Sequence, residues 1–146
     1  MDSINGIPAL DDLDPAALVG QYSRDLRTGL FAPTGPMYDT GPMTVPKITG
    51  FGGAELRIRR LGYTVQIYSV GNVTGTVPTG LVELVAAGNV PAGLRPPSNR
   101  WGSVFLSGNT TASAVARAEG SVALVNDTGS TRSSFQLTIT WFVGGE

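Results

Sequence analysis

The stretch Ser134-Phe135-Gln136-Leu137-Thr138-Ile139-Thr140-Trp141-Phe142-Val143 alternates large apolar residues with polar ones along most of its length. A period of two is typical of a β-strand with one face in a core and the other in solvent. The pattern therefore predicts that Phe135, Leu137, Ile139, Trp141 and Val143 point into a core, and that Gln136, Thr138 and Thr140 point away from it. A slip of one residue would expose the whole apolar set, so the alternation also restricts how this strand pairs.

Alternation of the same kind recurs upstream. Leu56 and Ile58 alternate with charged residues in the stretch 55–59, and a turn at Leu61-Gly62 leads into a second alternating stretch at 63–68, which predicts a hairpin. We expect further strands at 81–87, 102–107, 111–118 and 121–125. About seven short strands separated by Gly-, Asn- and Pro-containing turns predict an all-β protein, an antiparallel β-sandwich of the jelly-roll type, over residues 49–146. A few apolar residues occupy strand positions whose side chains are expected to point away from the core. They are candidates for subunit contacts: Tyr68, Val70, Phe105 and Phe142.

The composition restricts the chemistry that this domain can perform. The 146 residues carry a formal net charge of −1 and include neither Cys nor His. Disulfide frameworks, thiol nucleophiles, imidazole bases and zinc sites built on Cys or His are therefore excluded. No stretch has the length and hydropathy of a membrane span or the pattern of a signal peptide, so we expect a soluble protein made inside a cell.

Residues 1–48 have a different character and predict an N-terminal attachment arm. The first 40 residues contain six Asp and two Arg, whereas the remainder of the chain is mildly basic. Asp14-Pro15 and Gly29 are typical of the two ends of a helix, which predicts a helix over about 15–28. Its apolar stripe would dock on a neighbour: Leu18, Tyr22 and Leu26. The proline-rich stretch from Gly29 to Lys47 predicts an extended connector that lies along a protein surface.

Few residues could support catalysis or hold a metal ion. Glu55 and Glu83 lie at outward positions of predicted strands, where a carboxylate is solvated, so we expect no catalytic role. The acidic run 11–14 lacks the spacing of a calcium loop, and the glycine-rich run 50–53 lacks the lysine of a phosphate-binding loop. The sequence therefore predicts no catalytic residue, no metal and no cofactor.

Several residues are candidates for ligand binding. Arg57, Arg59 and Arg60 form the densest basic cluster, which we interpret as a solvated or inter-subunit salt-bridging face, because a pI near 5.3 disfavours nucleic-acid binding. Trp101 could stack on a sugar, although a core or interface role is also compatible with its position. Other residues at the same loop edge or in turns could present polar groups to a glycan: Asn99, Arg100, Thr110, Asn126 and Asp127.

One arrangement of motifs resembles a known family. Arg59-Arg60-Leu61-Gly62 is followed by the strand from Tyr63 and then by Val90-Pro91-Ala92-Gly93-Leu94-Arg95-Pro96-Pro97. This order is similar to the C-terminal β-sandwich domains of tailed-bacteriophage minor tail proteins and tail fibres, over about residues 50–143. In the loop itself, Pro91, Pro96 and Pro97 fix φ and Gly93 permits a positive φ, which predicts a rigid corner. Arg95 is expected to hold that corner by donating hydrogen bonds to carbonyl groups.

The resemblance implies a non-enzymatic virion structural protein that forms a homotrimer and recognises a host-surface glycan. The arm would bind other virion proteins, and the chain would be located on the phage tail. Trimer symmetry would raise the avidity of shallow sites. A capsid decoration or head-fibre protein remains an alternative, as do a free carbohydrate-binding module and a glycan-cleaving enzyme.

Overall fold

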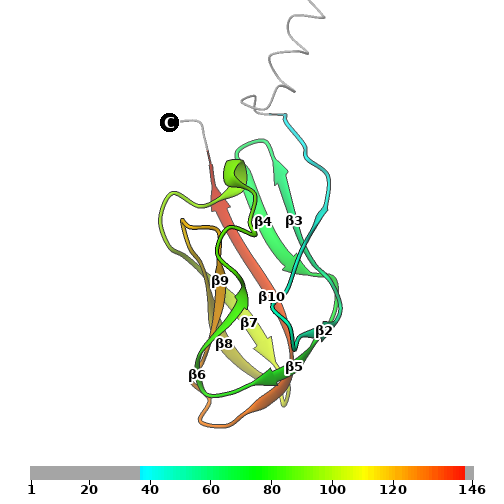
Figure 1. Ribbon diagram of the computed structural model, residues 1–146, viewed down its shortest axis with the longest axis vertical. Helices are drawn as coiled ribbons and strands as arrows, with labels where there is room; N and C mark the ends of the chain where they lie inside the picture. Colours follow the sequence, from blue (N-terminus) through cyan, green and yellow to red (C-terminus); the bar gives the residue numbers. More distant parts are fainter. Residues whose placement is uncertain (1–36, 144–146) are drawn as a thin grey trace, which may run out of the picture.

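The computed structural model describes residues 37–143, in which ten antiparallel strands form one continuous sheet (Figure 1). The strand order is β1-β3-β4-β10-β7-β8-β9-β6, while β5 pairs with β10 and β2 pairs with β5. The strands are β1 (Met43–Val45), β2 (Gly52–Gly53), β3 (Leu56–Leu61), β4 (Thr64–Ser69), β5 (Val73–Val77), β6 (Gly80–Val85), β7 (Arg100–Leu106), β8 (Thr110–Ala116), β9 (Val122–Asn126) and β10 (Arg132–Phe142). The prediction of an all-β antiparallel fold is therefore confirmed.

Strand β10 lies at the centre of the sheet. Its C-terminal half pairs with β4, its first residues pair with β5, and its opposite edge pairs with β7. Phe135, Leu137, Ile139 and Trp141 are almost completely buried, and the intervening polar residues are exposed. The predicted inward and outward directions of the β10 side chains are therefore confirmed. Because β10 is also central in the sheet, the core is organised around this strand.

The predicted hairpin of β3 and β4 is present. Leu61 pairs with Thr64 across a two-residue turn in which Gly62 has a φ of 62°, a left-handed conformation that glycine adopts without strain. Leu56, Ile58 and Arg60 share the inward face of β3, and Arg60 keeps only 9% of its surface exposed. Of the two interpretations of the arginine cluster, a solvated face is wrong for Arg60, because its side chain lies on the same side of β3 as the two core residues before it.

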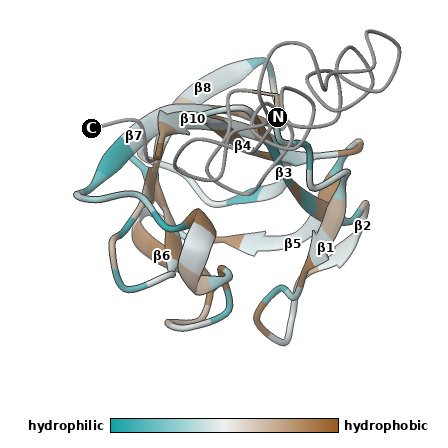
Figure 2. Cartoon of the chain, turned by 90° about the horizontal axis from the view of Figure 1, so that it is seen from above, coloured by the Kyte–Doolittle hydropathy of each residue, from teal (hydrophilic) through white to brown (hydrophobic). Residues whose placement is uncertain are grey.

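The sheet curls on itself and does not divide into two separate sheets. Seen from above, β5 and β6 lie across from β7, β8 and β10, with the core between them (Figure 2). The strand pairings thus describe one curled half-barrel, and the jelly-roll form of the sandwich that the sequence predicted is not confirmed. Strands β1, β2 and β5 were not predicted, because they are short and lie in stretches rich in Gly, Pro and Thr, where alternation is weak.

The described end of the connector pairs with the edge of the sheet; the sequence predicted only that the connector lies along a protein surface, without naming which. Strand β1 pairs with β3, the Thr40 N–H donates to the Arg60 carbonyl, and the Gly62 N–H donates to the Tyr38 carbonyl. The predicted helix over 15–28, with its stripe of Leu18, Tyr22 and Leu26, lies outside the described residues. The domain boundary at residue 48 stays a prediction. Within residues 37–143 no helix has the length and apolar character needed to cross a membrane.

The segment between β6 and β7 crosses one end of the half-barrel (Figure 1). It contains the short 3-10 helix η2 (Ala92–Leu94), and Leu94 and Pro96 are buried beneath it. The indole N–H of Trp141 donates to the Leu94 carbonyl over 2.9 Å. Nε and Nη2 of Arg95 donate to the carbonyls of Val90 and Gly88, at 2.9 and 3.3 Å, as the sequence predicted.

Two details of this corner refine the prediction. Gly93 is not among the glycines with positive φ, so the predicted left-handed conformation is wrong at this position. The η2 turn uses ordinary helical geometry there, and Pro91 instead begins it with a φ of −54°. Pro97 is exposed at the far side of the corner. The segment therefore caps the core through Leu94 and Pro96.

Candidate outer-face binding site

The residues that point away from the core on four adjacent strands form a surface that we call the outer face. All of them are uncharged, and aromatic, hydroxyl and amide side chains predominate. The outer face consists of Thr64, Gln66 and Tyr68 on β4, Gln136, Thr138, Thr140 and Phe142 on β10, Trp101, Ser103 and Phe105 on β7, and Thr111 and Ser113 on β8. Since an exposed sheet face commonly carries charged residues, this composition indicates a surface that contacts a partner or a neutral ligand.

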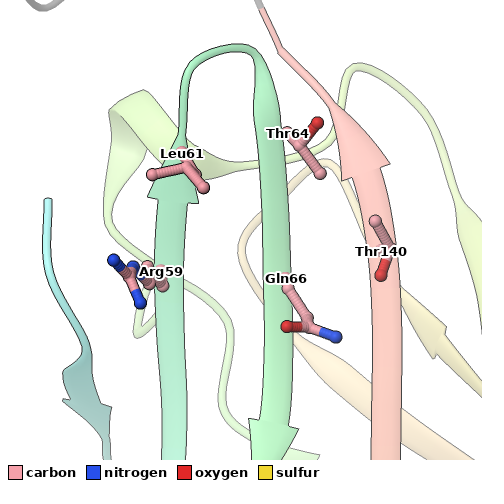
Figure 3. A pocket seen from close by; sticks show the side chains of 5 residues that line it. All are labelled: Arg59, Leu61, Thr64, Gln66 and Thr140. Atoms are coloured by element: carbon pink, nitrogen blue, oxygen red, sulfur yellow. The ribbon is translucent and has the colours of Figure 1, made fainter. Parts of the chain in front are cut away.

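A shallow hollow of about 370 Å³, the threonine hollow, opens at the upper end of the outer face (Figure 3). Cross-strand pairing places its members together, because Arg59 lies opposite Gln66, which in turn lies opposite Thr140. Leu61 is 56% exposed and forms an apolar edge, and Thr64 pairs with it across the hairpin. The hollow thus combines hydroxyl, amide and guanidinium groups with one apolar side chain.

The positive charge at this hollow is neutralised by Asp39. Nε of Arg59 donates to Oδ1 of Asp39 over 3.0 Å, and Nη2 donates to Oδ2 over 2.7 Å, a two-point contact. The hydrogen bond from Arg59, together with that from the Gly41 N–H, lowers the pKa of Asp39 from 3.8 to about 2. The pair is therefore ionised at neutral pH, and it fixes the guanidinium at the rim of the hollow.

A second hollow of about 240 Å³ lies further down the outer face, between β4, β10 and β7. We call it the serine hollow; its lining residues are Ser69, Ser103, Phe105, Gln136, Leu137 and Thr138. The Ser69 hydroxyl accepts a hydrogen bond from the Leu137 N–H, and Gln136 donates to the Asn72 side chain. Among residues 37–143, the side chains that line the two hollows include no carboxylate.

Trp101 lies on the outer face with 61% of its surface exposed. The structure therefore leaves the indole accessible rather than placing it in the core. Strand β7 approaches β10 closely at this point, because a Cβ on Gly102 would lie 2.5 Å from the Thr138 carbonyl oxygen. Trp101 pairs with Val115, which is buried although it lies outside the main core cluster. The exposed ring is thus fixed to a closely packed part of the sheet.

The glycan-binding residues proposed from sequence divide into two groups. Asn99, Arg100 and Trp101 lie at the start of β7, where Arg100 donates to the Ser98 hydroxyl over 2.6 Å. Thr110 lies at the opposite end of the β7–β8 hairpin and donates to the Ser107 carbonyl. Asn126, the last residue of β9, and Asp127, which follows it, lie at this same lower end. The six residues therefore do not form one site.

Asn126 is buried and serves the fold, so its assignment to ligand binding was wrong. It is only 1% exposed, and Nδ2 donates to the carbonyls of Val77 and Ser130, each over 3.0 Å. Oδ1 accepts hydrogen bonds from the N–H and the hydroxyl of Thr128. The polar atoms of the side chain are thus used to hold a turn, whereas Asp127 beside it is exposed.

The remaining charged residues are mostly used in local pairs. Glu55 contacts Arg57 at 3.3 Å, and Glu83 contacts Arg117 at 2.8 Å. Glu55 precedes β3 and Glu83 lies on β6 at the far end of the sheet order, so they do not form a carboxylate pair. Within residues 37–143 no cluster of three or more metal-ligating side chains exists. The outward positions predicted for both glutamates are confirmed.

Sequence reasoning did not identify the threonine hollow as a site. Thr140 was correctly predicted to point away from the core, and Thr64 and Gln66 lie in a stretch predicted only to alternate. These residues come from segments more than seventy residues apart and meet only through the β4–β10 pairing. The signal that could have found them is the lack of charge at every outward position of 64–68 and 136–142. Such a signal becomes visible only once these two strands are known to be neighbours.

No protein-family model matches this chain, and no curated protein matches it. Among solved structures, it is similar to the head domain of phage bIL170, from work on the receptor-binding domains of lactococcal phages. The TM-score is 0.55 at 14% sequence identity, and the match covers 70% of this chain and 97% of that one. At this identity the likeness shows a shared fold, which extends over nearly the whole of that head domain.

Proposed function

We propose that this protein is a bacteriophage virion protein whose β domain recognises a saccharide on the host cell surface. The observation that carries the proposal is an uncharged outer face, with hollows lined by hydroxyl and amide groups, on the fold of a phage head domain. The tail is the proposed location, with the arm of residues 1–48 binding other virion proteins. The proposal includes no catalytic step.

The chemistry of the threonine hollow suits a neutral sugar. A saccharide needs hydrogen-bond donors and acceptors in nearly one plane and an apolar surface for its C–H groups. Thr64, Gln66 and Thr140 provide the former, and Leu61 provides the latter. Arg59 is already neutralised by Asp39, so it can donate to a hydroxyl without demanding an anion. A shallow site of this kind binds weakly by itself, which makes several copies on one particle useful.

We further propose that the protein is a homotrimer and that the lower part of the outer face forms the subunit contacts. Phe105 is 50% exposed and Val70 is 48% exposed, at or near the serine hollow. Aromatic residues are enriched and charged residues depleted at the centres of protein interfaces. This arrangement would leave the threonine hollow accessible on each subunit.

The saccharide proposal is tested by applying the full chain to an array of bacterial surface glycans. We expect binding that is weakened at least about tenfold by Thr140→Arg, because a long charged side chain would fill the hollow. The control is Thr79→Arg, which introduces the same charge at an exposed position before β6, away from the hollow and from the outer face. Equal binding by both variants, or release of reducing sugar from a bound glycan, would contradict the proposal.

The trimer is tested separately by sedimentation of the purified chain. We expect a mass of three copies for the wild type and a smaller one for Phe105→Glu, because burial of an unpaired carboxylate at an interface is costly. Phe142→Glu, at the upper end of the same face, should leave the trimer intact. A monomeric wild-type protein would contradict the trimer proposal. It would not affect the saccharide proposal, which the glycan array tests separately.

A further inference from the structure

Arg60 is a buried cation without a counter-charge in the part of the chain that the structure describes. It is 9% exposed, its Nε donates to the Gly62 carbonyl over 2.7 Å, and its guanidinium carbon lies 5.3 Å from the centre of the Tyr38 ring. No carboxylate of residues 37–143 forms an ion pair with it. A guanidinium has five N–H donors, so most of its capacity to bind an anion is not used by these contacts.

The side chain lines a hollow of about 440 Å³ on the opposite side of β3 from the outer face. This Arg60 hollow lies between the segment that leads into β1, the end of β3 and helix η2. Its walls are largely apolar. Its lining residues are Tyr38, Asp39, Thr40, Met43, Arg60, Pro91, Gly93 and Leu94. A cation at the base of an apolar hollow favours a ligand with one acidic group and an apolar part.

The other polar groups of this hollow are already engaged. Both carboxylate oxygens of Asp39 accept hydrogen bonds from Arg59, and Oδ1 also accepts one from the Gly41 N–H. The Thr40 hydroxyl donates to the Gly41 carbonyl and accepts from the Arg60 N–H. A sugar in this hollow would leave most of its hydroxyl groups without partners, whereas a carboxylate on an aliphatic chain would not. The chemistry therefore favours an acidic peptide over a saccharide.

We propose that the Arg60 hollow binds an acidic side chain of a protein partner, with an adjacent apolar residue against Met43 and Leu94. The carboxylate would accept two hydrogen bonds from the planar guanidinium, the geometry in which this group binds carboxylates best. The hollow lies where the chain enters the β domain from its N-terminal residues, so it suits a neighbouring protein at that end. The site is separate from the saccharide site proposed on the outer face, and either can fail alone.

The probe is the capped dipeptide acetyl-Leu-Glu-amide, titrated into the full chain while backbone amide resonances are recorded by NMR. We expect saturable shifts at Thr40, Gly93 and Leu94, which surround the hollow. Acetyl-Leu-Gln-amide has nearly the same shape without the charge and should bind at least about tenfold more weakly, a difference of about 1.4 kcal/mol. Glucuronate, which carries a carboxylate on a sugar ring, should also bind more weakly than the acidic dipeptide.

Two variants separate binding from folding. Arg60→Gln removes the charge but also disturbs the contact with Gly62, so its thermal unfolding must be measured beside the titration. Gly93→Leu leaves Arg60 unchanged and adds an apolar side chain to the lining of the hollow, at a position where a Cβ meets none of the described atoms within 4 Å. Both should abolish the shifts. The control is Arg57→Gln, which removes an arginine already paired with Glu55 on the other side of the same strand.

Three results would overturn the proposal. The first is equal affinity for the acidic and the amide dipeptides, because the guanidinium would then not be the anchor. The second is retention of the dipeptide by a folded Gly93→Leu variant, which would place the dipeptide elsewhere. The third is tighter binding of glucuronate than of the dipeptide, which would assign the hollow to an acidic saccharide.

Discussion

Replacement of Trp141 by phenylalanine tests whether the η2 segment is fastened to the core in the way the structure describes. The indole is 1% exposed, and its N–H donates to the Leu94 carbonyl. Phenylalanine removes this donor and leaves a buried carbonyl without that partner, which costs about 1 to 3 kcal/mol. The smaller ring leaves a void worth about 1 kcal/mol more. The free energy of unfolding should therefore fall by about 2 to 4 kcal/mol.

The assay is urea unfolding followed by circular dichroism, with all proteins at one concentration, because association of the folded chain would itself add stability. For urea slopes typical of a small domain, the midpoint should fall by about 1 to 2 M. Hydrogen exchange at the Leu94 amide, which donates to the Pro91 carbonyl, should quicken in the same variant. This second measurement reports on the segment itself and not on the whole fold.

The matched control is Trp101→Phe. That indole is 61% exposed, so the same chemical change should alter stability by no more than about 0.5 kcal/mol. The reasoning is refuted if the Trp141 variant is as stable as the wild type, or if the Trp101 variant loses more stability than the Trp141 variant. The first result would mean that the η2 segment is held by its prolines and Arg95 alone.

Three further predictions concern single residues. Gly102→Ala should cost about 1 to 3 kcal/mol of stability in urea unfolding, because its Cβ would lie 2.5 Å from the Thr138 carbonyl oxygen and push β7 away from β10; unchanged stability would contradict the close approach. Asn126→Ala should cost about 1 to 3 kcal/mol in the same assay because the turn loses its hydrogen bonds, whereas Asp127→Ala should be nearly neutral. The lowered pKa of Asp39, about 2 against 3.8, means that the carboxylate stabilises the fold above about pH 4 and that this contribution is lost as the pH falls through 2. The stability difference between wild type and Asp39→Asn, followed by thermal unfolding, should therefore shrink as the pH falls from 4 to 2, and a constant difference would argue against the ion pair.

Local alternation explains why much of the strand content could be predicted. In β10 and in the β3–β4 hairpin, side-chain parity alone gave the buried and exposed faces, since a strand places successive side chains on opposite sides. The same rule applied to Arg60 would have placed it beside Leu56 and Ile58 in the interior. Charge alone is a poor guide at that position, because the guanidinium is buried against the Tyr38 ring and donates to the Gly62 carbonyl.

The amino-acid sequence by itself determined the antiparallel β class, the inward face of β10 and the corner held by Arg95, because each depends on residues close together in the chain. The curling of one sheet, the meeting of Gln66 with Thr140 and the burial of Asn126 and Arg60 were decided only by the tertiary structure. Each of these features depends on which distant strands pair and which segment covers them. Strand pairing sums many weak contacts over the whole domain, so no short stretch of sequence encodes it.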